Sequence, residues 1–398
     1  MPFIFDLVVE FLDLRYQPPE MPELLRDIYD ETEAQRATRY EHDKLKAGLW
    51  ASCISTAVTV AMFAFGGFGV VDDFARQLFE KNEILSGLAF MAFLAIGGTL
   101  IGLPFSLYNT FVIEQKYGFN RVTAKTFALD RLKSLVMSSV IGGPILAGIM
   151  WLFMLAGEYD WAWVLVWASV AVISVLLLFL SPVLMGVFNK YENLEEGELK
   201  SAIEELATET NFEVGGIYKM DGSKRSSKAN AFFAGFGRYR RIALFDTLIE
   251  KLSVSQIRAV LAHEIGHCKH NHIFKNLAYQ LLTMALLFYC TQELLYNELL
   301  FQAFDMTPSI GGSLFLIFSF VLTPLSGLLG LVANTMSRYF EYQADAFAAH
   351  RAKASNELIE GLKILSKDSL SKLQPHPLKA WLEHSHPTLR ERVERLQV

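Results

Sequence analysis

The chain has 398 residues, of which 52% are hydrophobic and 20% are charged, and its formal net charge at pH 7 is -6. So much apolar side chain in a chain of this length argues against a soluble enzyme and indicates a membrane protein. No basic run suggests nucleic-acid binding. The three cysteines, Cys53, Cys268 and Cys290, are an odd set with two members in apolar segments, which argues against a disulfide framework.

The first apolar stretch, Phe3 to Leu14, is too short to span a membrane and is interrupted by Asp6, Glu10 and Asp13. We interpret it as an interfacial helix or as the remnant of a longer first span; it lacks the basic start of a signal peptide. Six stretches of about twenty or more mainly apolar residues follow, each long enough to cross roughly 30 Å of hydrocarbon. They are Ala47 to Val71, Ile84 to Phe111, Leu135 to Ala156, Trp161 to Phe188, Leu277 to Tyr296 and Gly311 to Thr335.

The connections between these stretches differ in charge. One side holds most of the lysine and arginine residues, in the loop from Lys116 to Lys133 and in the long segment from Lys190 to His272, among others. The other side has short loops whose only bases are Arg76 and Lys81. Positive charge accumulates on the cytoplasmic side of membrane proteins. We therefore expect the segment from Lys190 to His272 to face the cytoplasm.

That long segment has the composition of a folded soluble domain. Leu194 to Glu209 is typical of an amphipathic helix, and Gly215 to Met220 of a short strand. Ala229 to Phe245 predicts a hairpin, because two aromatic-rich runs are separated by glycines and bases. The hairpin is interpreted either as structural support or as a sheet edge, starting at Asn230, to which an extended substrate adds through backbone hydrogen bonds.

The motif H-E-I-G-H occupies residues 263–267. Ser253 to Gln256 forms a capping-box pattern, and apolar residues at helical spacing follow, so the motif is expected on a helix. His263 and His267 then share one face, where both imidazoles can bind one tetrahedral zinc ion while Glu264 lies beside them as a catalytic base. Hydrolysis is the leading hypothesis; the alternative is a surface helix with ordinary solvated histidines.

A catalytic zinc ion normally has three protein ligands. Downstream, Glu341 and Asp345 are four residues apart on a predicted helix, so Glu341 could complete the coordination and Asp345 could accept the ring N–H of a ligating histidine. The alternative is a solvated acidic face, but the flanking residues are mostly apolar. His270 and His272 are interpreted as interfacial or packing histidines, because one ion needs no further ligand.

Several motifs in this order resemble the M48 zinc metalloproteases, particularly the Ste24 type of CAAX prenyl protease. The motifs are L-A-H-E-I-G-H at 261–267, E-Y-Q-A-D at 341–345, S-H-P at 385–387 with Arg392, N-A-F at 230–232 before I-A-L-F-D-T-L at 242–248, and the membrane signatures at 104–120, Pro182 and 188–189. The resemblance covers most of the chain.

The resemblance implies that His263, His267 and Glu341 bind one zinc ion per chain. It also implies that Glu264 activates the water and that Asp345 is the hydrogen-bond partner of a ligating histidine.

Further roles are implied by the motifs outside the ligand set. His386 is expected to stabilise the oxyanion, provided that the tail folds back onto the metal, and otherwise to begin a helix. Arg392 is expected to support the site, and Asn230 and Ala231 to hold the substrate.

The implied fold class is mainly α: a polytopic transmembrane helical bundle that encloses a chamber, with a zincin-like (gluzincin) catalytic domain bearing a small β-hairpin or sheet. We expect an N-terminal interfacial or partial transmembrane segment, four transmembrane helices, a cytoplasmic catalytic domain, two further transmembrane helices and a C-terminal catalytic segment. Their expected bounds are 1–46, 47–188, 189–272, 273–335 and 336–398.

The expected function is that of a membrane-integrated zinc metalloendopeptidase acting on peptides or proteins, with C-terminally prenylated substrates as one option. The alternatives are a quality-control protease of the HtpX type, for which fewer spans are expected, and a non-catalytic transporter or scaffold, which would require more intramembrane charges. The expected surroundings are a lipid bilayer and no nucleic acid. A missing retrieval signal at Leu396 to Val398 favours a bacterial-type cytoplasmic membrane over the endoplasmic reticulum of a eukaryote.

Overall fold

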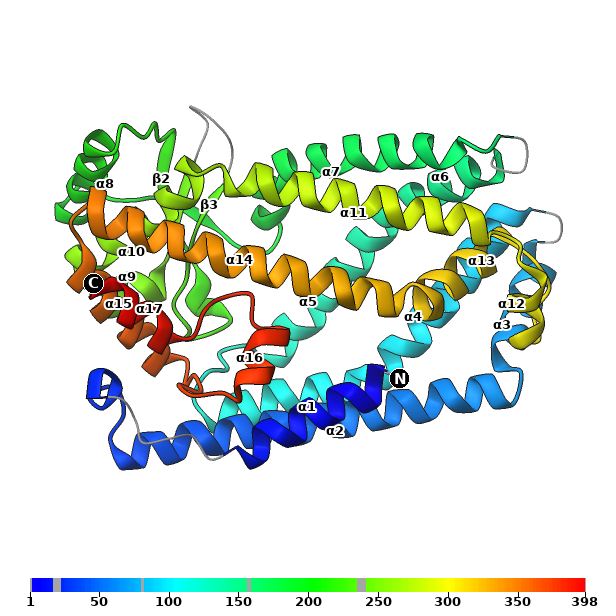
Figure 1. Cartoon of the computed structure of the whole chain (residues 1–398), viewed down its shortest axis with the longest axis horizontal. Coiled ribbons are helices and arrows are strands. Elements are labelled where there is room, and N and C mark those ends of the chain that lie inside the picture. The colour runs from blue at the N-terminus through cyan, green and yellow to red at the C-terminus, as the bar shows by residue number, and fades with distance from the viewer. Residues whose placement is uncertain (1, 17–22, 80–81, 156–158, 235–240, 398) are drawn as a thin grey trace.

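A computed structural model describes residues 2–16, 23–79, 82–155, 159–234 and 241–397 (Figure 1). Most of these residues are helical. The elements before the sheet are α1 (Pro2–Arg15), η1 (Glu23–Leu25), α2 (Glu31–Ala64), α3 (Gly67–Phe79), α4 (Glu83–Tyr108), η2 (Asn109–Glu114), α5 (Ala124–Met137), η3 (Ser138–Gly142), α6 (Gly143–Met154) and α7 (Ala162–Gly186). The elements of the sheet and its surroundings are β1 (Tyr191–Asn193), α8 (Glu198–Glu209), β2 (Gly216–Met220), η5 (Gly222–Lys224), β3 (Ala231–Ala234), β4 (Arg241–Phe245), α9 (Asp246–Lys251) and α10 (Val254–Lys269). The remaining elements are α11 (His272–Leu294), α12 (Glu298–Ala303), α13 (Ile310–Leu316), η7 (Ile317–Val321), α14 (Thr323–Arg351), α15 (Ser355–Asp368), α16 (Pro377–Glu383) and α17 (Leu389–Leu396).

Five helical runs in the described residues are long and apolar enough to cross a membrane, and a bent pair provides a sixth candidate. The five are Glu31–Ala64, Glu83–Glu114, Ala124–Met154, Ala162–Leu180 and His272–Leu294, and the pair is Ile310–Val321 with Thr323–Arg351. Each of the six overlaps one of the predicted apolar stretches, so the chain is an integral, multi-pass membrane protein.

The bend in the sixth candidate measures 57° and lies immediately before Thr323 and Pro324. Proline lacks the N–H that would continue the helical hydrogen bonds, which is a common cause of sharp helix bends. The hydroxyl of Thr323 donates to the carbonyl oxygen of Ser319 at 2.8 Å and satisfies one of the freed acceptors.

The helix α1 does not belong to the candidate spans. Its 14 residues correspond to about 21 Å, well short of the roughly 30 Å of a bilayer core. It lies along α2 and contacts α16 (Figure 1). Lys379 of α16 pairs with Glu10, and Lys372, which precedes α16, pairs with the buried Asp13 at 2.8 Å. Glu10 and Asp13, two of the acidic residues that interrupt its apolar sequence, therefore attach it to the C-terminal part of the chain.

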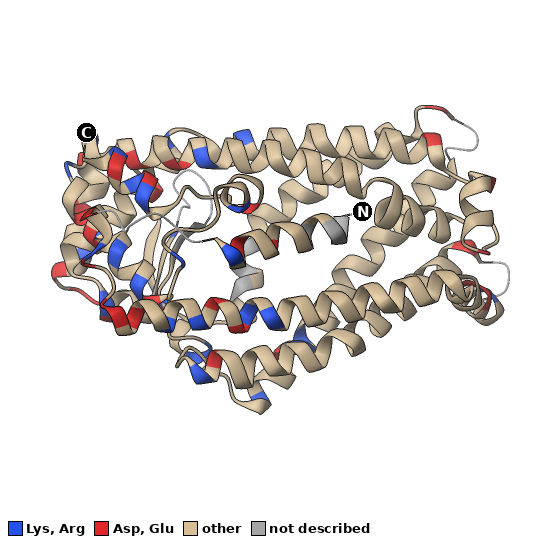
Figure 2. Ribbon diagram, turned by 60° about the horizontal axis from the view of Figure 1, so that its bottom comes forward, with Lys and Arg blue, Asp and Glu red and all other residues tan. Residues whose placement is uncertain are grey.

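The long helices lie around the centre of the molecule rather than through it (Figures 1 and 2). Only 0–17% of the residues in the apolar window of each of the five single spans are buried. Where α4 and α13 cross, Gly87 and Gly311 allow contact between the backbones, since a Cβ on Gly311 would lie 2.4 Å from Cα of Gly87. The predicted fold class is confirmed: a helical membrane bundle is joined to a small sheet.

The sheet has four strands in the order β1-β2-β4-β3. β1 pairs antiparallel with β2, β2 pairs parallel with β4, and β3 pairs antiparallel with β4. The predicted strand and hairpin correspond to β2 and to the pair β3 and β4, and the turn at 235–240 lies outside the described residues. This order places β3 at an edge of the sheet.

The motif helix α10 lies at the centre of the soluble core. It packs against α14, α15 and α8, and its apolar residues Ile257 and Leu261 are buried with Ile242 and Leu244 of β4. The predicted capping box at Ser253 is present. Because α10 is enclosed by neighbours, the packing of the core sets the position of the motif.

Candidate metal centre

The two histidines of the motif lie one turn apart on α10 and face the same side. Nε2 of His263 is 3.1 Å from Nε2 of His267. His263 is 6% exposed, so its imidazole is largely shielded from bulk water. Side chains four residues apart on a helix share a face, and the expected convergence is present.

The helix α14 approaches α10 closely because Gly266 has no side chain. A Cβ at this position would lie 2.9 Å from Cα of Ala344 and 3.0 Å from Cβ of Phe347, closer than nonbonded carbon atoms approach. The close approach brings Glu341 and Asp345, one turn apart on α14, to the histidines. Both carboxylates are buried, with exposed fractions of 4% and 3%.

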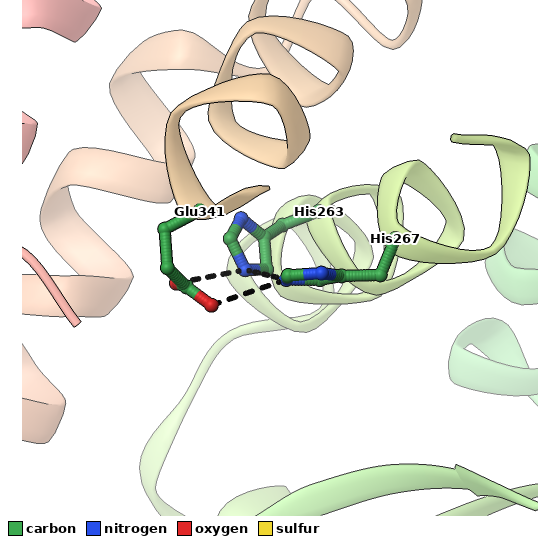
Figure 3. A group of neighbouring side chains, drawn as sticks. All are labelled: His263, His267 and Glu341. Atoms are coloured by element: carbon green, nitrogen blue, oxygen red, sulfur yellow. Dashed lines mark hydrogen bonds and ion pairs between the residues drawn. The ribbon is translucent and has the colours of Figure 1, made fainter. Parts of the chain in front are cut away.

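His263, His267 and Glu341 form a cluster whose ligand atoms all lie within 4.8 Å of one another (Figure 3). Nε2 of His263 is 3.5 Å from Oε2 of Glu341, and Nε2 of His267 is 3.2 Å from Oε1. Ligands about 2.05 Å from a tetrahedral zinc ion are about 3.3 Å apart. The 3.1 Å between the two imidazole nitrogens is close to this spacing. Each nitrogen also has one Glu341 oxygen within 3.5 Å, Oε2 for His263 and Oε1 for His267, so the group fits a zinc ion bound by two imidazoles and one carboxylate.

Asp345 connects the cluster to the C-terminal helix α17. Its Oδ1 is 2.8 Å from Nδ1 of His263. Arg392 donates from Nε to Oδ2 at 2.9 Å and from Nη2 to Oδ1 at 2.6 Å. With Nδ1 of His263 held by a carboxylate, its Nε2 is available to a metal ion. The buried charge of Asp345 is balanced by the buried guanidinium of Arg392.

The pKa of His263 depends on burial and on the two carboxylates beside its ring. Burial disfavours the charged imidazole, but hydrogen bonds to Asp345 and Glu341 outweigh burial and raise the pKa of His263 to about 9. At neutral pH, a proton on His263 then balances part of the carboxylate charge. A divalent cation at the cluster would take the place of that proton.

The C-terminal segment folds back onto the cluster. Nε2 of His386 is 3.4 Å from Oε1 of Glu341, and the carbonyl oxygen of His384 accepts from Nη1 of Arg338 on α14 at 2.6 Å. The role expected for His386 required that the C-terminal tail fold back onto the metal site, and the tail does so. The side chain of His386 is 64% exposed, so it borders the cluster from the solvent side.

The remaining predicted site residues differ in how close they come to the cluster. Glu264 is half-buried and makes no hydrogen bond or ion pair with any described residue, so its carboxylate is free to act on a water molecule. Asn230 immediately precedes the edge strand β3, whose first residue is Ala231. Among the described residues, no hydrogen bond joins Asn230 or Ala231 to the ligands.

Two contributors to the site were missed by sequence reasoning. Gly266 was given no role of its own within the motif, and His272 was interpreted only as an interfacial or packing residue. In the structure, Nδ1 of His272 is 2.9 Å from Nδ1 of His267. A second histidine five residues beyond a ligand was a usable signal for His272, but the turn that brings it back is not visible in the sequence.

The fold and the cluster together define a class, that of multi-pass membrane metallopeptidases. Two family models match the chain and support this class. The one described as "CAAX prenyl protease N-terminal, five membrane helices" matches residues 13–190, and the one described as "Peptidase family M48" matches residues 193–398. The chain belongs to peptidase family M48.

Curated relatives match nearly the whole chain. The CAAX prenyl protease 1 homologue of Arabidopsis thaliana is 34% identical over 96% of this chain and 92% of its own length. The homologue of Homo sapiens is 32% identical over 96% of this chain and 88% of its own. The crystal structure of S. mikatae Ste24p matches with a TM-score of 0.93 and 31% identity, covering 100% of this chain and 96% of that one.

These likenesses, together with the candidate spans, identify a membrane zinc metalloprotease that acts on peptide or protein substrates. They do not favour the HtpX-type or the non-catalytic alternative.

Proposed function

We propose that this protein is a zinc endopeptidase of the Ste24 type that cleaves C-terminally prenylated peptides. The observation that carries the proposal is the convergence of His263, His267 and Glu341, with His386 at the open side. The named relatives are CAAX prenyl proteases over nearly the whole of this chain. One zinc ion per chain would be held by these three ligands.

The donor set fits zinc because two imidazole nitrogens and one carboxylate oxygen leave a fourth position for water. When bound, zinc would lower the pKa of that water and polarise the scissile carbonyl group. Glu264 would take the proton from the water and return it to the leaving amine. His386 would donate a hydrogen bond to the carbonyl oxygen as negative charge develops there.

Asp345 and Arg392 would act through His263. The Arg392 guanidinium orients the carboxylate of Asp345, and that carboxylate fixes the ring proton of His263 on Nδ1. When the second proton of His263 is displaced by the metal ion, the remaining ring hydrogen would stay on Nδ1 and leave Nε2 to the metal.

The substrate would bind along β3. Strand order leaves β3 at an edge, and an extended peptide can add to an edge strand through backbone hydrogen bonds. We propose that Asn230 and Ala231 mark the start of this binding edge. We propose that residues 189–272 and 336–398 form one catalytic unit, although two spans at 273–335 separate them in sequence. Each part then contributes one of the two helices, α10 and α14, that carry the cluster.

We also propose that the catalytic end faces the cytoplasm. Charged residues gather at the end that holds the sheet and the C-terminus, whereas few lie at the opposite end (Figure 2). Excess lysine and arginine mark the cytoplasmic side. The bacterial-type membrane expected from the sequence stays a prediction.

The test uses the purified full chain in detergent with three substrates: a farnesylated C-a-a-X peptide, its non-prenylated form and an unfolded membrane protein. We expect selective cleavage of the farnesylated peptide, loss of cleavage on chelation, and recovery on adding zinc. Glu264→Gln should keep zinc and lose about 10²–10⁴-fold in rate, since it removes the proton acceptor. Equal cleavage of all three substrates would refute prenyl selectivity, and parental cleavage by Glu264→Gln would refute the mechanism.

A further inference from the structure

The ring of His267 is engaged at both nitrogens. Its Nε2 belongs to the metal cluster, and its Nδ1 is 2.9 Å from Nδ1 of His272. On the far side, Nε2 of His272 is 2.9 Å from Oε1 of Gln343. Gln343 lies on α14 between Glu341 and Asp345, so the same helix that supplies the third ligand also closes this chain of contacts.

His272 is held in place by its surroundings. Asn271 adopts a left-handed conformation, with φ of 56°, and this turn between α10 and α11 returns His272 to the end of the motif helix. The side chain of His272 is buried, and its ring stacks on Phe340 at 4.1 Å with an angle of 10° between the planes. Burial and stacking therefore hold the ring of His272 in one orientation relative to the ring of His267.

The side chain of Gln343 determines which atoms donate in this chain of hydrogen bonds. Oε1 of Gln343 can only accept, while its amide nitrogen donates to the hydroxyl of Tyr339 at 3.3 Å. Nε2 of His272 must therefore carry the hydrogen. In a neutral ring the other nitrogen, Nδ1, is then an acceptor, and the hydrogen between the two rings belongs to Nδ1 of His267. The Nε2 atom of His267 is left with the lone pair that a metal ion needs.

The two histidine ligands thus have unlike partners. His263 is supported by the carboxylate of Asp345, whereas His267 is supported by a neutral imidazole. A carboxylate partner makes an imidazole a stronger ligand and adds negative charge near the ion, which reduces its power to acidify water. A neutral partner fixes the ring of His267 without adding charge.

We propose that His272 and Gln343 form a neutral hydrogen-bond relay that positions His267 as a metal ligand. His272 is thus a positioning residue rather than a packing residue. This proposal rests on the zinc centre proposed above, and it extends that centre to two residues with no part in the ligand set or in proton transfer.

The test measures the zinc affinity of the metal-free full chain in detergent by competition with a chromophoric chelator. His272→Phe keeps a ring that can stack on Phe340 but has no acceptor, and it should weaken zinc binding by about 10–100-fold. His272→Asn places an amide oxygen near the position of Nδ1 and should recover most of this loss. The visible spectrum of the Co²⁺-substituted protein should change in His272→Phe and stay close to the parental spectrum in His272→Asn.

His270→Phe is the matched control. His270 also stacks on His272, at 5.5 Å, but its side chain makes no hydrogen bond with the described residues, so parental zinc affinity is expected. Parental affinity in His272→Phe, or an equal loss in the phenylalanine and asparagine variants, would overturn the relay. If His272→Phe does not fold, Gln343→Leu replaces it; it should show a smaller loss, and parental affinity there would also overturn the relay. Failure of the parental protein to bind zinc would instead refute the proposed function.

Discussion

Replacing Gly266 by alanine should separate the two helices that carry the metal ligands. The new Cβ would lie 2.9 Å from Cα of Ala344, 3.0 Å from Cβ of Phe347 and 3.1 Å from the carbonyl oxygen of Ala344. Carbon atoms in ordinary contact are about 3.5–4.0 Å apart, so α14 would have to move by roughly 0.5–1 Å. Such overpacking typically costs about 1–3 kcal/mol of folding free energy.

The movement of α14 should also weaken zinc binding and slow peptide cleavage. Glu341 lies less than one turn before Ala344 on α14, so its carboxylate would move with the helix away from the two imidazoles. A misplacement of about 1 Å in an active site can lower the rate by about 10²-fold. We therefore expect Gly266→Ala to unfold at a lower temperature, to bind zinc more weakly and to cleave peptide more slowly.

Gly361→Ala provides a matched control on α15, another neighbour of α10. A Cβ at Gly361 of α15 would meet its nearest neighbour, Cγ2 of Val260, at 3.7 Å, which is an ordinary contact. Alanine favours a helix over glycine by about 0.5–1 kcal/mol, so this variant should be slightly more stable and equally active. Thermal unfolding with and without zinc, chelator competition and peptide cleavage compare the two variants. A Gly266→Ala protein with parental stability and zinc affinity would refute the reasoning.

Three further predictions concern charge. Asp345→Asn should weaken zinc binding by about 10–100-fold, because the imidazole of His263 loses its anionic partner, and chelator competition would detect this; unchanged affinity would remove Asp345 from the site. Zinc affinity should rise about tenfold per pH unit between pH 6 and pH 8 and level off near the His263 pKa of about 9. The reason is that zinc must displace the proton that His263 holds below that pKa. An affinity that stays constant from pH 6 to pH 8 would contradict this prediction. Asp13→Asn should lower the stability by about 1–3 kcal/mol in thermal unfolding, because Asp13 is buried and pairs with Lys372, whereas parental stability would mean that α1 is not held by this contact.

The sequence alone predicted the parts of this protein that depend on local order. The six apolar stretches, the capping box at Ser253 and the common face of His263 and His267 follow from residue type and helical spacing, which any chain with these letters would share. Even so, the sixth stretch was predicted as one span, whereas the corresponding helices meet at a bend of 57° immediately before Thr323 and Pro324. The strand β1 was not predicted, because its three residues form no pattern without the partner β2.

The site required contacts over long separations in sequence. Asp345 lies 82 positions beyond His263, and their meeting depends on the contact between α10 and α14 at Gly266. The position of His386 depends on how the C-terminal segment is held against α14. For Glu341 and His386, spacing and resemblance named the residues, but only the structure places them beside the histidines; their roles stay predictions.

What the sequence by itself determined is therefore the membrane class of the protein and the chemistry of its motif, since hydropathy and helical periodicity are properties of short segments. Tertiary structure alone decided which nitrogen of each histidine is free for a metal ion. In the proposed centre, Asp345 would make that choice for His263 and His272 would make it for His267. Both partners reach the rings only through the packing of α14 and the left-handed turn at Asn271. The physical reason is that a tautomer is fixed by a hydrogen bond, and a hydrogen bond depends on position in space rather than on position in the chain.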